Sequence, residues 1–178
     1  MGWLGVDQLC DGLEAPLPSP AGGSAAAVAG AMAASLVVMV GRGSADWAGG
    51  ADAMRLAAGL RERLLALGAE DVEAVASLLE ARQTDGGPEA DAWLAASRVP
   101  AEIAECAADV SVLAVAAAQL GKRPMRADAE AAVLLARTAT KIAAGILATN
   151  LASGRVATPE AERLRATVKQ AVERAGAG

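Results

Sequence analysis

The feature that most constrains the fold is the stretch from Ser24 to Gly41, which is built almost wholly from small and apolar residues. It follows the loop PSPAGG, in which prolines fix the backbone and two glycines leave it without side chains. Ser24 is a favourable N-cap, so we expect a helix to begin there. Because the free N–H groups of a first helical turn attract anions, the loop is a candidate ligand-binding element.

The small residues of this helix recur on one face, at Ala26, Gly30 and Ala33/Ala34, which predicts close contact with another helix. The stretch is long enough to raise the question of a membrane span. Its Ala and Gly content, the polar Ser35 and the lack of flanking aromatic residues instead favour a helix buried inside an oligomer. No membrane partner is expected.

The rest of the chain also has a helical pattern. Apolar residues recur at helical spacing, as at Leu56, Leu60 and Leu64, and no segment alternates as a strand would. Gly68 is a possible kink, Pro100 is expected to open a helix, and Thr158 and Pro159 are a favourable helix start. Helical segments are expected at 3–13, 24–40, 51–83, 89–97, 100–120, 127–152 and from 159. Five or six helices are expected to form an all-α, antiparallel bundle, in a single domain over 1–178.

Composition limits the core and the partners. Of the 178 residues 54% are hydrophobic, yet there is no Phe or Tyr, and Ala, Leu and Val carry that share. A core of such small side chains is thin, which predicts a homodimer that buries more surface. The net charge of −5 gives no long-range attraction to nucleic acid, so no nucleic-acid partner is expected.

Two absences narrow the chemistry. The chain contains no histidine, which excludes Ser-His and Cys-His nucleophiles and His-bearing metal sites. Cys10 and Cys106 form no ligand cluster, and we expect both to be buried in a reducing compartment. The first residues lack the basic region of a secretory signal. We therefore expect a cytoplasmic protein that needs neither a metal nor a cofactor.

The segment PSPAGGSAAAVAGAMAASLVVMVG resembles the signature of the cyclodeaminase/cyclohydrolase family, which includes the C-terminal domain of formiminotransferase-cyclodeaminase. Four further segments resemble that family in the same order along the chain: DVEAV at 71–75, VPAEIA at 99–104, GKRPMRADAEAA at 121–132 and the pair Asn150-Leu151. The first segment is fairly specific, and the others add weight together.

The resemblance implies a dimeric helical bundle whose site lies at or near the subunit interface. It implies a small-molecule substrate, a tetrahydrofolate that carries a one-carbon group. Family members convert 5-formiminotetrahydrofolate to 5,10-methenyltetrahydrofolate with release of ammonia, or hydrolyse the methenyl form to 10-formyltetrahydrofolate. Both reactions require proton transfer near the folate nitrogens, and a carboxylate supplies it.

The resemblance also indicates site residues. Asp128 falls on the family's aspartate and is the first catalytic candidate, although an acidic residue in a first helical turn also stabilises the helix dipole. Asp71 is the second catalytic candidate, with a solvated helix face as the alternative. Six residues are candidates for substrate binding. Gly22, Gly23 and Ser24 belong to the loop, and Arg42 and Arg126 are cations for the glutamate tail of the folate. Asn150 carries an amide that either binds the ligand or pairs two helices.

The chain departs from the family pattern at several polar positions. Ala21 replaces a glycine of the family pattern and Ala127 replaces a serine. Lys122 and Ile146 replace asparagines, and Ala148 replaces an arginine. The scaffold is kept better than the polar site. Three functions stay open: folate cyclodeaminase or cyclohydrolase chemistry, the same chemistry on another imine-type substrate of a biosynthetic pathway, and a non-catalytic dimeric relative that binds a ligand or a protein.

Overall fold

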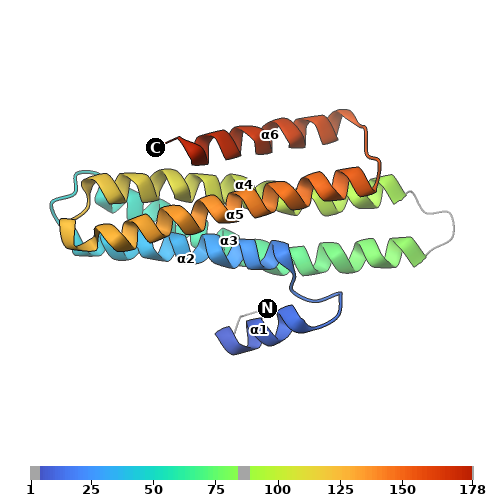
Figure 1. The fold of residues 1–178 in the computed structure, drawn as a ribbon, viewed down its shortest axis with the longest axis horizontal. Coiled ribbons are helices and arrows are strands. Elements are labelled where there is room, and N and C mark those ends of the chain that lie inside the picture. The colour runs from blue at the N-terminus through green and yellow to red at the C-terminus, as the bar shows by residue number, and fades with distance from the viewer. Residues whose placement is uncertain (1–4, 84–88, 178) are drawn as a thin grey trace.

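The computed structural model describes residues 5–83 and 89–177, and in these ranges the chain is helical, with no strand (Figure 1). The expected all-α fold is confirmed, and the described residues contain six α-helices and one short 3₁₀ helix. In chain order they are α1 (Val6–Glu14), α2 (Gly22–Gly43), α3 (Gly50–Gln83), α4 (Glu89–Leu120), η1 (Arg123–Met125), α5 (Arg126–Ser153) and α6 (Pro159–Gly176).

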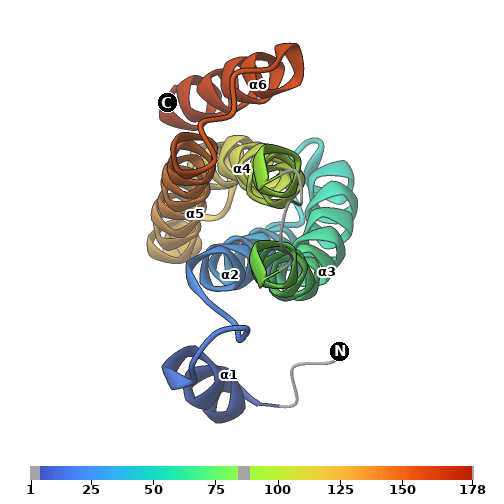
Figure 2. The same cartoon turned by 90° about the vertical axis from the view of Figure 1, so that its right-hand side faces the viewer.

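The four long helices form an elongated antiparallel bundle (Figures 1 and 2). Helix α2 packs against α3 and α5, and α4 packs against α5 and α3. Helix α6 lies over α4 and α5, whereas α1 lies apart beside α2 and makes few contacts. The arrangement leaves one long side of α2 and α5 without a covering helix.

Small side chains let α2 approach its neighbours closely, as the stripe on this helix predicts. Ala26, Ala33 and Ala34 are fully buried. A Cβ atom at Gly30 would lie 3.1 Å from a methyl carbon of Leu64 on α3. Burial of many alanines replaces the large aromatic residues that the chain lacks.

Several predicted helix boundaries are wrong. Helix α2 begins at Gly22 with Ala21 at the N-cap, so Ser24 lies in the first turn instead of capping it. The predicted helix 51–83 is confirmed as α3, which continues through Gly68. Helix α4 continues through Pro100 as a single helix, so the predicted division into 89–97 and 100–120 is wrong. The expected cap at Thr158 is confirmed, because its Oγ1 accepts a hydrogen bond from Ala161 N at 3.1 Å. The turn expected at 84–88 lies outside the described residues.

Helix α1 differs most from expectation. It contains no buried residue, and even the apolar Leu13 is 39% exposed. Cys10 is exposed as well, which corrects the prediction that both cysteines are buried, while Cys106 on α4 is half-buried. A short amphipathic helix gains little by itself, and the contacts of α1 with the bundle are limited to a few residues such as Val6 and Leu9, which lie near Val28 of α2 and Leu65 of α3.

In the part of the chain that the structure describes, three segments are long and apolar enough to cross a membrane by length and composition: Gly22–Gly43, Ala90–Leu120 and Arg123–Ser153. In the bundle these helices pack against one another, and 56% of the most apolar window of α2 is buried inside the protein. In the other two segments 44% and 39% of the most apolar window is buried, so helix–helix contacts account for only part of their apolar character.

Candidate functional site

The start of α2 is bound to the middle of α3 by one buried carboxylate. Asp71 is 5% exposed, and its Oδ2 accepts hydrogen bonds from Ser24 N at 2.9 Å and from Ser24 Oγ at 3.0 Å. The amide of Ser24 is one of the donors that a helix leaves unpaired in its first turn. Asp71, on the neighbouring helix α3, therefore accepts the hydrogen bond that an N-cap side chain usually accepts, the role that the sequence predicts for Ser24.

Gly23 provides the space for this contact. A Cβ atom there would lie 2.5 Å from Asp71 Cγ and 2.6 Å from Oδ2, and closer still to Oδ1. Gly22, by contrast, would meet only the Cδ1 atom of Ile146 on α5, at 3.4 Å. The second glycine is thus required for close approach of α3, whereas the first allows a side chain.

The environment of Asp71 suits a carboxyl group that holds a proton. Burial raises the pKa of Asp71, and the hydrogen bonds from Ser24 partly oppose that shift. Ser24 Oγ carries one proton and lies 3.0 Å from both Asp71 Oδ2 and the carbonyl oxygen of Gly68. When Ser24 donates to Gly68, a protonated Asp71 donates to Ser24 and every partner is satisfied. This is the property that a general acid or base requires.

Asn150 has a partner that explains it. Its Nδ2 donates to the carbonyl oxygen of Ala96 on α4 at 3.2 Å. In a regular helix that carbonyl accepts from the residue four positions later, which here is Pro100 and has no N–H. Asn150 therefore satisfies the carbonyl that Pro100 leaves unpaired, in agreement with the helix-pairing interpretation. The Asn150 segment of the signature is thus bonded to the turn of α4 that directly precedes the signature segment at 99–104.

The remaining predicted residues lie at the other end of the bundle. Asp128 is exposed in the first turn of α5, and Arg42 is exposed in the last turn of α2. Gly43 packs against Met125, which brings these two helix ends together. Arg126 Nε donates to Glu130 Oε1 at 2.8 Å.

Within one protomer the candidates therefore form two groups. Asp128 and Ile146 both lie on α5, and Ile146 adjoins Gly22. At 1.5 Å per residue these two positions are roughly 27 Å apart along the helix. Asp71 and Ser24 belong to the Gly22 end, so one small molecule cannot touch them and Asp128 in the same subunit.

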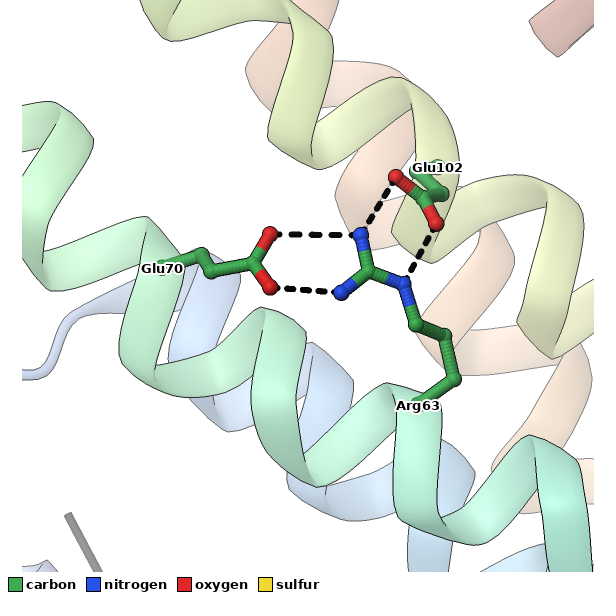
Figure 3. A network of polar contacts seen from close by, with 3 residues as sticks. All are labelled: Arg63, Glu70 and Glu102. Carbon is green, nitrogen blue, oxygen red and sulfur yellow. Dashed lines mark hydrogen bonds and ion pairs between the residues drawn. The ribbon is translucent and has the colours of Figure 1, made fainter.

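Sequence reasoning missed an ion cluster one residue from Asp71. Figure 3 shows the guanidinium of Arg63 on α3 between the carboxylates of Glu70 on the same helix and Glu102 on α4. The bonds from Arg63 to Glu102 measure 2.5 and 2.7 Å, and the hydrogen bond from Arg63 lowers the pKa of Glu102. The cluster joins α3 to α4 and fixes the turn that carries Asp71. The seven-residue spacing of Arg63 and Glu70 was the available signal.

Across residues 5–83 and 89–177, no group of three or more His, Cys, Asp or Glu side chains is arranged to hold a metal ion.

The fold defines a class, the all-helical bundle of cyclodeaminase type. The crystal structure of formiminotetrahydrofolate cyclodeaminase from Thermotoga maritima matches with a TM-score of 0.82 at 21% identity, covering 97% of this chain and 94% of that one. None of the curated protein sequences matches the chain. A family model, formiminotransferase-cyclodeaminase, matches residues 5–171, and the chain therefore belongs to this family.

Proposed function

We propose that the protein catalyses cyclodeaminase or cyclohydrolase chemistry on a tetrahydrofolate that carries a one-carbon group. The observation that carries the proposal is the family match, which spans residues 5–171. The similar structure from Thermotoga maritima is that of a formiminotetrahydrofolate cyclodeaminase. The alternative of a non-catalytic binding relative rests on the replaced polar positions of the family pattern, and the family match does not favour it. A cytoplasmic location is part of the proposal.

The cyclodeaminase reaction is a proton transfer coupled to ring closure. N10 of the folate attacks the formimino carbon, a C–N10 bond forms, and the bond to the formimino nitrogen breaks with loss of ammonia. The formimino group reacts as its protonated amidinium form, and a carboxylate accepts the proton of N10 and delivers it to the leaving nitrogen, so that NH3 departs and the positive charge stays on the product. The methenyl product is a cation, which a carboxylate stabilises electrostatically. We assign these roles to Asp128 and Asp71.

A homodimer unites the two groups of candidates. The side of α2 away from the bundle carries no charge between Gly22 and Gly41, and Met32 and Met39 there are 55% and 38% exposed. On the adjoining side of α5, Ile142 is 39% exposed. If two such faces pack with a two-fold axis across the helices, Asp128 of one subunit approaches the Gly22 end of the other.

The size of this face suits a stable dimer. Helix α2 has 22 residues and is about 33 Å long at 1.5 Å per residue. With two helices about 9 Å apart, the face covers on the order of 600 Å² per subunit. Standard interfaces bury roughly 800 Å² per partner. The exposed helix α1 beside this face supplies further apolar surface.

The primary test is turnover of purified protein. We expect release of ammonia from 5-formiminotetrahydrofolate or loss of 5,10-methenyltetrahydrofolate absorbance, with kcat lowered about 100-fold or more in Asp128→Asn and in Asp71→Asn. Glu62→Gln, at an exposed carboxylate of α3, is the matched control and should leave kcat unchanged. Binding of both folates without turnover would favour the non-catalytic relative. Failure to bind either would point to another imine-type substrate.

Subunit complementation tests the shared site. Asp128→Asn and Asp71→Asn chains are inactive alone, but a mixed dimer retains one site with both carboxylates. Co-expression of the two single variants should therefore restore a substantial fraction of activity. Co-expression of either single variant with a chain that carries both substitutions should not restore activity. Light scattering of Met32→Lys should show a monomer. Full activity in such a monomer would contradict the shared site.

A further inference from the structure

A cavity of about 530 Å³ lies between α4 and α5, on the side of α5 that faces α4. Helix α6 covers the neighbouring part of the α4/α5 surface and ends there, since Ala175 and Gly176 adjoin Arg137 and Lys141 of α5. Beyond this end the cavity is open. Its lining residues are Val115, Ala118, Gln119, Arg126, Glu130, Val133, Leu134 and Arg137.

The floor of the cavity is apolar. Val115, Ala118 and Val133 are half-buried, and Leu134 is 66% exposed although it lies in a groove. Cavities of 300–1,000 Å³ with an apolar lining and a few polar groups are typical small-molecule sites. An exposed leucine at such a place gains free energy when a ligand covers it.

The walls are basic in a chain of net charge −5. Arg126 and Arg137 lie on the same side of α5, roughly 16 Å apart at 1.5 Å per residue. Arg137 Nε donates to the carbonyl oxygen of Ala175 at 2.8 Å, so this guanidinium is held at the end of α6. Glu130, the acidic lining residue, forms an ion pair with Arg126.

We propose that this cavity is a second binding site, which takes an elongated amphipathic anion. The apolar body of the ligand lies on Val115, Val133 and Leu134, and its carboxylate pairs with a guanidinium at one end. A guanidinium is suited to this role because it binds carboxylates in a planar, two-pronged geometry. The cavity lies on the opposite side of α5 from Asp128, so its ligand does not contact that aspartate. Arg126, which the family resemblance indicates for the folate's glutamate tail, is assigned here to the second site instead.

The probe is decanoate, titrated calorimetrically into the full chain, with decyltrimethylammonium as the ligand of opposite charge. We expect one saturable site per chain for decanoate and at least tenfold weaker binding of the cation. Arg126→Gln and Leu134→Glu should each weaken decanoate binding about tenfold. The matched controls are Arg55→Gln, which also breaks an exposed helix ion pair, and Leu56→Glu at a 49% exposed leucine of α3; both should bind normally.

Three results would overturn the proposal: equal binding of anion and cation, loss of binding in the controls as large as in the cavity variants, or displacement of decanoate by 5-formyltetrahydrofolate. The last result would make the cavity part of the folate site. Circular dichroism of each variant verifies the fold. Because decanoate binding is measured without turnover, the proposal stands or fails independently of the folate reaction.

Discussion

The hydrogen bond from Asn150 to Ala96 allows a sharp test of how α4 tolerates an internal proline. Replacing Asn150 with alanine leaves the carbonyl of Ala96 without its donor, at a residue that is only 5% exposed. Leaving a buried acceptor unpaired costs about 1–3 kcal/mol. We expect Asn150→Ala to lower the free energy of unfolding by about 2 kcal/mol.

The same substitution should cost little once Pro100 is gone. In Pro100→Ala the backbone N–H of residue 100 is restored and can donate to the Ala96 carbonyl, as in any regular helix. The carbonyl then has a donor without Asn150. The double-mutant cycle should therefore give a coupling energy of about 1–2 kcal/mol between these two positions.

Urea denaturation followed by far-ultraviolet circular dichroism measures all four free energies of unfolding. Thr149→Ala, at the neighbouring exposed position of α5, is the control and should change stability by less than about 0.5 kcal/mol. Additive effects of Asn150→Ala and Pro100→Ala would refute the reasoning, because Asn150 would then stabilise the bundle through some other contact.

Three further predictions use the same measurement. Gly23→Ala should destabilise the protein by about 1–3 kcal/mol through overpacking against Asp71, and Asp71→Ala should relieve most of that cost. Burial raises the pKa of Asp71 in the folded protein above its value in the unfolded chain. The free energy of unfolding should therefore fall as pH rises from the unfolded pKa to the folded pKa. Asp71→Asn should remove this pH dependence, and an unchanged pH profile in that variant would show that Asp71 does not cause it. Thr158→Ala should cost about 1 kcal/mol through loss of the α6 cap, and no measurable loss would mean that the cap is redundant.

Local sequence signals predicted the fold well where one residue type has one physical consequence. Helical periodicity and the lack of strand alternation indicated an all-α bundle, and small residues on α2 indicated close packing. Thr158 followed by Pro159 marked the start of α6. Pro100 was misleading because a proline inside a helix is usually too costly, and the compensating donor lies far away in sequence.

The candidate site was only partly predictable for the same reason. The glycine–serine loop and the two aspartates were found from the sequence signature, but the signature carries no information about which of them meet. The structure brings Ser24, Gly23 and Asp71 together and leaves Asp128 at the opposite end of the bundle. Glu102, the partner of Arg63 on α4, was missed because salt-bridge partners on separate helices have no local signature, whereas the seven-residue spacing of Arg63 and Glu70 on α3 was a signal that was not used.

The sequence by itself determined that this chain is helical and that its core consists of small side chains, since periodicity and side-chain volume are properties of short segments. Only the tertiary structure decided that Gly23 provides room for Asp71, that Asn150 replaces the donor missing at Pro100, and that the catalytic candidates lie at two ends. Each of these depends on contacts between helices that are distant in sequence. Such contacts are fixed by the packing of the whole bundle, and a short segment of sequence carries no information about that packing.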